Sequence, residues 1–218
     1  MRYIEQREAV CRFAVEMEER GLTWGTAGNV SCRVEEGALV TPSTMPYREI
    51  TPADVNLMAL DGTLLPDEGT NERAPSVEHK VHLACYRARD DVGAVIHAHP
   101  LVASAFAAAR VPLPSFLDEM GVFVGDEVRV AEYAISGTPD IAENVVKAMG
   151  ETANAVFLAS HGLVACGRDL RAAMHVAGQV ERAAQTYLAA TMLGGPAELP
   201  EDARKLFAAV FDYKRLND

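Results

Sequence analysis

Short apolar runs that alternate with amphipathic helical patterns constrain the fold of this chain more than any other feature of its sequence. Two of the runs, GAVIHAHP at 93–100 and AVFLAS at 155–160, read as buried strands, and Pro100 stops the first. Residues 29–65 form shorter β-favouring pieces separated by turn signals such as Asp61-Gly62, which predicts antiparallel strands. Apolar residues recur at helical spacing over 4–20, 76–88, 101–109, 139–149, 168–193 and 200–213. Strands and helices in this order predict an α/β or α+β sandwich in which helices cover a sheet.

The same patterns continue along the chain without a break, so we expect one domain over residues 1–218. The sequence has no serine- or glycine-rich linker, no internal repeat and no shift in composition. A single domain of this length buries roughly 70% of the surface that its unfolded chain exposes, so a hydrophobic core is expected.

The charge balance limits the partners of the chain. Lys and Arg total 20 against 31 Asp and Glu, which gives a formal net charge of -11. This sign is wrong for a protein that binds nucleic acid or anionic lipid, so we expect neither as a partner. The longest apolar run, 101–109, is far shorter than the roughly 20 residues of a membrane span. Four single cysteines and an N-terminus without a signal-peptide pattern predict a cytoplasmic location.

Three histidines lie at the ends of the two buried strands. His97 and His99 are two residues apart, and because side chains alternate faces along a strand, both imidazoles should point the same way. His161 follows the second strand. Three neutral imidazoles with one oxygen ligand or water are a usual arrangement for catalytic zinc, and manganese or cobalt suits the same ligands. The alternative is that these are structural histidines.

Small hydroxyl, amide and glycine residues form a second group of candidates. They occur in TAGNVS at 26–31, in TPST at 41–44 and in Pro75-Ser76, each beside an expected element boundary. Backbone N–H groups and hydroxyls at such places can hold an anion, and Ser76 is the expected N-cap of the helix that contains Glu78. Each cluster taken alone could equally be a turn or a helix cap.

The motifs TAGNVS, TPS, PSxExxxH, HAHP and SHGLVACG, in this order and at these separations, resemble the class II aldolase/adducin family over about residues 5–195. The resemblance implies a three-layer α/β/α sandwich with a central, mostly antiparallel sheet, and a C4 homotetramer with sites between subunits. It implies one divalent metal per chain, most often Zn²⁺, with ligands His97, His99, His161 and Glu78. It implies a catalytic role for Glu78 and phosphate-binding roles for Gly28, Asn29, Ser43, Thr44 and Ser76.

The chemistry implied by the resemblance is that of a metal-dependent aldolase, a lyase of carbon-carbon bonds. A small ketose 1-phosphate would be cleaved or formed at its C3-C4 bond through a metal-stabilised enediolate, giving dihydroxyacetone phosphate and an aldehyde. Glu78 would move protons on the enediolate carbon. The metal would replace the Schiff-base lysine of other aldolases, and none of the lysines of this chain lies in a buried apolar strand.

Three positions depart from the family pattern. Thr44 replaces the glycine of the TPSG motif, and Val77 replaces the second serine of PSSE. The general acid is a tyrosine in a family enzyme, and this position falls near 117–119, where Asp118 and Glu119 are the candidates. A C-terminal tyrosine that closes a neighbouring subunit's site corresponds to Tyr213.

Two alternatives follow from the same resemblance. The first is another metal-enolate reaction on a sugar phosphate, catalysed by a dehydratase, decarboxylase or epimerase. Glu78 argues against the pentulose-phosphate epimerases, which carry aspartate at this position. The second is a non-catalytic adducin-like binding protein, a reading that the three retained histidines disfavour.

Overall fold

The computed structural model describes residues 1–217 and consists of a mixed eight-stranded sheet between two layers of helices. The strands are β1 (Asn29–Val34), β2 (Gly37–Val40), β3 (Asn56–Met58), β4 (Ala94–Ala98), β5 (Leu113–Pro114), β6 (Glu127–Ala131), β7 (Ala155–Leu158) and β8 (Gly162–Gly167). The helices are α1 (Ile4–Glu19), α2 (His79–Ala88), α3 (Leu101–Ala109), α4 (Asp118–Phe123), α5 (Pro139–Met149), α6 (Leu170–Met192) and α7 (Glu201–Asn217). Two 3-10 turns, η1 (Tyr47–Glu49) and η2 (Pro52–Asp54), precede β3.

The strand order is β3-β2-β1-β4-β8-β7-β6-β5, and every pair except β6 with β7 is antiparallel. The expected class, a sandwich with a mostly antiparallel sheet, is therefore confirmed. The central pair, β4 and β8, lies between β1 and β7. This order places the two buried strands recognised in the sequence at the middle of the sheet.

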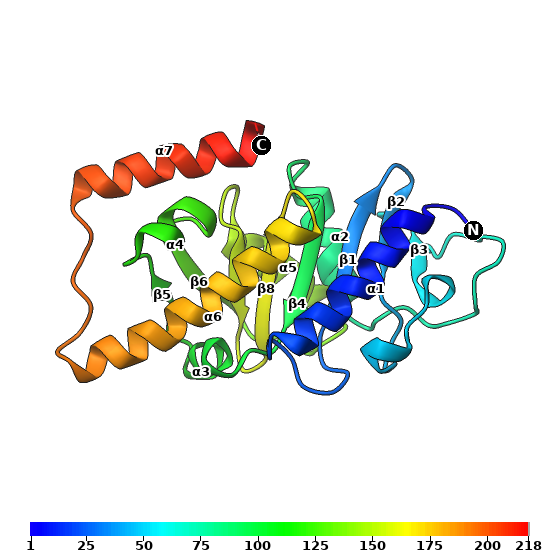
Figure 1. Cartoon of the computed structure of the whole chain (residues 1–218), viewed down its shortest axis with the longest axis horizontal. Helices are drawn as coiled ribbons and strands as arrows, with labels where there is room; N and C mark the ends of the chain where they lie inside the picture. The colour runs from blue at the N-terminus through cyan, green and yellow to red at the C-terminus, as the bar shows by residue number, and fades with distance from the viewer. Residues whose placement is uncertain (218) are drawn as a thin grey trace.

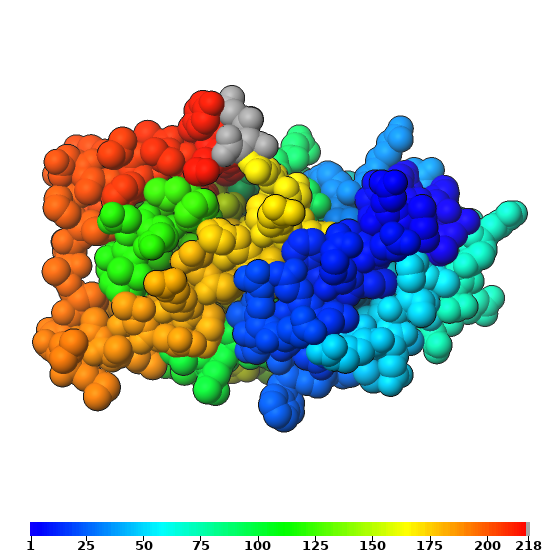
Figure 2. Space-filling model, viewed as in Figure 1, coloured from blue at the N-terminus to red at the C-terminus, as the bar shows by residue number. Residues whose placement is uncertain are grey.

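Each face of the sheet has its own hydrophobic core, because side chains alternate along the strands. On β4, Ala94 and Ile96 belong to the core under α1, α3 and α6, whereas Val95 belongs to the core under α2 and α5. Figure 1 shows α1 and α6 crossing one face and α2 and α5 lying behind the sheet. In the space-filling view of the same face, α1 and α6 run diagonally across it, and the segment 193–200 leads from α6 to α7 at one end (Figure 2).

The structure corrects the expected boundaries at three places. The second helix begins at His79 rather than at residue 76, because Pro75 pairs with Pro42 in a β-bridge and residues 77–78 form a turn. The last helix extends to Asn217 instead of ending at Tyr213. Between 110 and 127 the sequence pattern predicted no element, yet β5 and α4 form there. With two and six residues, both elements are too short to show a period.

Among the described residues, no helix is long and apolar enough to cross a membrane.

Candidate metal centre

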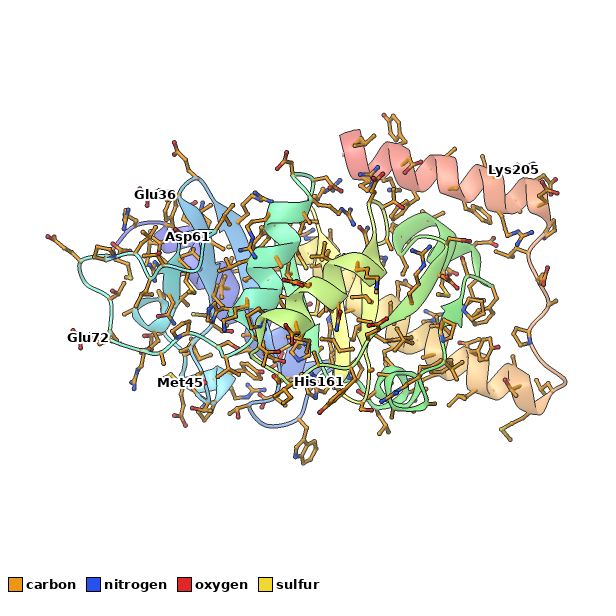
Figure 3. The ribbon with its side chains drawn as sticks, turned by 180° about the vertical axis from the view of Figure 1, so that it is seen from behind. Glu36, Met45, Asp61, Glu72, His161 and Lys205 are labelled. Carbon is orange, nitrogen blue, oxygen red and sulfur yellow. The ribbon has the colours of Figure 1, made fainter. Side chains whose placement is uncertain are left out.

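The pairing of β4 with β8 brings the three strand-end histidines together. His97 lies on β4 opposite Val164, and His161 lies in the turn that enters β8. Gly162 permits this close pairing, since a Cβ at this position would lie 2.6 Å from the carbonyl oxygen of Ala98. The ring centroids of His97, His99 and His161 are 4.7 to 4.8 Å apart in all three pairs. Figure 3 shows His161 in the lower part of the molecule.

Hydrogen bonds and burial leave the imidazoles in the form that binds metals. The Nδ1–H of His97 donates to the carbonyl oxygen of Leu163 at 2.9 Å, which leaves Nε2 of the ring facing the other two histidines. The Nε2 atoms of His97 and His99 face each other at 2.9 Å. Burial and the neighbouring rings lower the pKa of His99 to about 4 and lower the pKa of His161 from its usual value. Neutral imidazoles of this kind are ligands for divalent metals.

Glu78 faces the same cluster from the start of α2, a helix that covers the sheet. Its carboxylate oxygens lie 3.0 Å from Nε2 of His97 and 3.3 Å from Nε2 of His161. Asn29 donates through Nδ2 to Oε2 at 3.1 Å, and the Ser136 hydroxyl donates to Oε1 at 2.8 Å. Burial alone would raise the pKa of Glu78, but the positive charge that His97 and His161 carry when protonated, together with hydrogen bonds from His97 and Ser136, outweighs it, and the pKa lies well below its usual range. Glu78 is therefore an ionised carboxylate.

This donor set fits a divalent cation. The three histidine ligand atoms lie within 4.8 Å of one another. Tetrahedral coordination with bonds near 2.1 Å requires nitrogens about 3.4 Å apart, so small side-chain movements suffice. The anionic Glu78 supplies an oxygen and offsets the charge of the cation. Nitrogen and carboxylate ligands of this kind suit Zn²⁺, Mn²⁺ and Co²⁺.

The predicted phosphate positions lie on segments that the fold brings beside the histidines. Gly28 has φ +102°, and a Cβ there would lie 2.6 Å from the carbonyl oxygen of His97, so only glycine fits. The segments that carry Ser43 and Ser76 are joined by the bridge between Pro42 and Pro75 and by a hydrogen bond from Ser43 N to Ala74 O at 2.9 Å.

Thr44 has an unusual backbone conformation, and Ser76 lies outside the helix that it was expected to cap. Thr44 has φ +55°, the left-handed conformation for which glycine is the usual residue, so its backbone is strained. The prediction that Ser76 is the N-cap of α2 is wrong, because Glu78 occupies that position. The turn at 77–78 separates Ser76 from the helix, and its carbonyl oxygen accepts from His79 N at 3.0 Å. The positive end of the α2 dipole therefore lies at Glu78 rather than at Ser76.

The two general-acid candidates lie on α4, and Tyr213, the tyrosine expected to close a neighbouring site, lies on α7. Asp118 and Glu119 form the exposed first turn of α4, and Tyr213 is 63% exposed on α7. The two helices pack together, and a Cβ at Gly121 would lie 2.8 Å from Cβ of Phe207. In Figures 1 and 3, α7 runs along the upper edge, whereas His161, labelled in Figure 3, lies in the lower part of the molecule. Folding of one chain thus does not bring Tyr213 to its own histidine cluster.

Two side chains near Glu78 had no role predicted from the sequence, although one of them, His82, is the last residue of the PSxExxxH motif. Ser136 is in the loop between β6 and α5, for which the sequence pattern predicted neither an element nor a site. His82 is fully buried one helical turn after Glu78, and its Nδ1 lies 2.6 Å from the Ser31 hydroxyl. The i, i+4 spacing of Glu78 and His82 was the available signal, because it places both on one face of a helix.

Fold and site together define an α/β/α protein with a histidine and carboxylate centre for a divalent cation. The model of the class II aldolase and adducin N-terminal domain matches residues 8–188, and the chain belongs to this family. It is 37% identical over 95% of its length to a 5-deoxy-D-ribulose 1-phosphate aldolase of Bacillus thuringiensis serovar kurstaki, of which it covers 96%. It is 35% identical to an L-fuculose phosphate aldolase of Escherichia coli, with 86% of this chain and 85% of that protein covered. A solved L-fuculose 1-phosphate aldolase superposes with a TM-score of 0.90 at 36% identity, covering 97% of this chain and 98% of the other.

Proposed function

We propose that this protein is a metal-dependent class II aldolase that cleaves and forms the C3-C4 bond of a small ketose 1-phosphate. The observation that carries the proposal is the position of the Glu78 carboxylate, 3.0 and 3.3 Å from Nε2 of two of the clustered histidines. A carboxylate at a cation site is placed to exchange protons with a substrate that enters the same site. The similar proteins of known name are aldolases of 5-deoxy-D-ribulose 1-phosphate and L-fuculose phosphate, which supports this substrate class.

His97, His99 and His161 would hold one divalent cation, with Zn²⁺ the first choice for such ligands. When bound, the cation supplies Lewis acidity toward the carbonyl and hydroxyl oxygens of the ketose. Glu78 removes and returns the proton at the carbon next to the carbonyl. Asn29 and Ser136 hold its two oxygens in place through the hydrogen bonds that they donate.

Gly28, Asn29, Ser43, Thr44 and Ser76 are proposed to bind the phosphate. Backbone N–H groups and hydroxyls at such turns can bind an anion, and the glycine at 28 lets its segment lie directly against the His97 carbonyl. A chain with a net charge of -11 needs local donors of this kind to bind phosphate.

The general acid is proposed to come from a neighbouring copy of the chain in a homotetramer with sites between subunits. Asp118, Glu119 and Tyr213 lie on the packed pair α4 and α7, which supports their acting on a neighbour's site as a group. We further propose that the chain forms one domain over 1–218 and works in the cytoplasm. Another enolate reaction on the same substrate class, by a dehydratase, decarboxylase or epimerase, is the second candidate. It is favoured by the absence of a tyrosine at 117–119.

The test is release of dihydroxyacetone phosphate from a panel of ketose 1-phosphates that includes 5-deoxyribulose 1-phosphate and fuculose 1-phosphate. Each substrate is assayed with metal-loaded protein, with and without a strong chelator. We expect release that the chelator abolishes and that added Zn²⁺, Mn²⁺ or Co²⁺ restores. Absence of release from protein that holds about one metal per chain would favour the second candidate.

A further inference from the structure

A row of buried, hydrogen-bonded polar side chains extends from Glu78 along the inner face of α2. Glu78, His82 and Tyr86 are spaced four residues apart, so they lie on one face of the helix. Asn29 and Ser31 are two residues apart on β1 and point to the same face of the sheet. The two elements contact each other through side chains: Asn29 bonds Glu78, and the Ser31 hydroxyl lies 2.6 Å both from Nδ1 of His82 and from the Tyr86 hydroxyl.

The direction of these hydrogen bonds fixes the tautomer of His82. If the Tyr86 hydroxyl donates to Ser31 and the Ser31 hydroxyl donates to Nδ1, both hydroxyl protons have acceptors. Any other arrangement leaves one hydroxyl proton without an acceptor among residues 1–217, and such a buried group is costly. The ring proton of His82 therefore resides on Nε2. Burial lowers the pKa of His82 to about 3, so the ring is neutral.

Two buried atoms of these side chains are complementary and unpaired. Within the described residues, Nε2 of His82 and Oδ1 of Asn29 have no hydrogen-bond partner, although both side chains are buried. The first is a donor in the tautomer above. The second is an acceptor, because the amide of Asn29 must direct Nδ2 toward the ionised Glu78. Helical side chains tilt toward the N-terminus, so the His82 ring leans toward the turn that carries Glu78.

We propose that His82 is a positioning residue for Glu78, acting through one ordered water that accepts from Nε2–H of His82 and donates to Oδ1 of Asn29. The water satisfies both buried atoms and fixes the amide plane of Asn29. That amide in turn holds Oε2 of Glu78 beside His97. The proposal assigns His82 no contact with substrate, and its catalytic consequence rests on the proposed aldolase function.

The first test replaces His82 by the two amides that each mimic one ring nitrogen. His82→Gln places its amide near the position of Nε2, whereas His82→Asn places its amide near Nδ1 and loses the Nε2 donor. We expect His82→Asn to lower kcat about tenfold, with KM changed less than about twofold and the bound metal retained. His82→Gln should recover most of kcat. His175→Asn, an exposed histidine on α6, is the matched control and should behave like the parent.

Equal losses in His82→Asn and His82→Gln, or a kcat of His82→Asn equal to that of the parent, would overturn the proposal. A second measurement on the unaltered protein does not depend on activity or on the folding of variants. Nitrogen NMR of the histidine rings should place the proton of His82 on Nε2, and a high-resolution crystal structure should contain the bridging water. A proton on Nδ1, or no water between the two atoms, refutes the proposal even if the protein proves to be an aldolase. The expected tautomer and water in a protein without aldolase activity would instead refute only the proposed function.

Discussion

The Nδ1–H of His97 donates a 2.9 Å hydrogen bond to the carbonyl oxygen of Leu163, so the backbone of β8 orients a side chain of β4. The acceptor is a main-chain atom, which means that the orientation depends on the register of the two strands rather than on another side chain. The register places Ala98 opposite Leu163 and depends on the glycine that begins β8. Metal affinity and strand packing are therefore linked at this point.

Gly162→Ala should weaken metal binding without unfolding the protein. The added Cβ would lie 2.6 Å from the Ala98 carbonyl oxygen, and the shift that relieves this clash moves Leu163 relative to His97. We expect a loss of about tenfold or more in Zn²⁺ affinity, measured by competition with a chromogenic chelator. Gly178→Ala, on α6 with no heavy atom closer than 3.9 Å to the new Cβ, is the control and should bind metal like the parent. Parental affinity in Gly162→Ala would contradict the link.

His97→Ala should lose metal and activity together, because it removes one of the three clustered nitrogens. Glu78→Gln should retain metal through the histidines and lose turnover by at least about a hundredfold, since the amide cannot accept a proton. Metal content by atomic absorption and turnover on the best ketose 1-phosphate distinguish the two variants. Activity in a metal-free His97→Ala protein would exclude the proposed mechanism.

Stability should fall as the pH drops below about 6.5, in part because of His82. Burial lowers its pKa in the folded state to about 3, so between these values the unfolded chain binds one proton more than the native protein. Each pH unit in this window then lowers the free energy of unfolding by up to about 1.4 kcal/mol. The free energy of unfolding, measured by urea denaturation at several pH values from 7 to 4, should fall less steeply with decreasing pH for His82→Gln than for the parent. Identical slopes would mean that His82 is protonated in the native state.

Thr44→Gly should be more stable than Thr44→Ala. Both substitutions remove the hydroxyl, but only glycine adopts φ +55° without steric strain. We expect the glycine variant to exceed the alanine variant by about 1 kcal/mol in the free energy of unfolding, measured by urea denaturation. Alanine equal to or better than glycine would indicate that the loop relaxes when Thr44 is replaced.

Trp24 provides a fluorescent probe of the proposed tetramer. It is the single tryptophan of the chain, it is 90% exposed, and its loop leads directly into Gly28. If a second copy of the chain covers the Trp24 side chain, tryptophan emission should move to shorter wavelength as the protein assembles. A dilution series followed by fluorescence and by sedimentation velocity tests this. A tetramer whose emission equals that of the monomer would place Trp24 outside the interface.

The sequence by itself determined most of the elements and much of the candidate site. Strand-length apolar runs and helical periodicity predicted the central strands and the covering helices, because local burial patterns follow the geometry of each element. The alternation of side chains on a strand predicted that His97 and His99 face the same way, and their rings lie 4.7 Å apart. The motifs placed Glu78 and His161 in the same family pattern, and both lie at the cluster.

Only the tertiary structure decided how these elements meet. The β4 and β8 pairing sets the position of His161, and the packing of α2 on β1 sets Glu78 against Asn29. The contact of Ser136 with Glu78 arises from a loop for which the sequence pattern predicted no site. Contacts between residues far apart in the chain depend on strand order and helix packing, and no local pattern encodes them. The same reason places Asp118 and Tyr213 on the packed helices α4 and α7. Of these helices, α7 runs along the upper edge of the molecule, away from His161 (Figure 3).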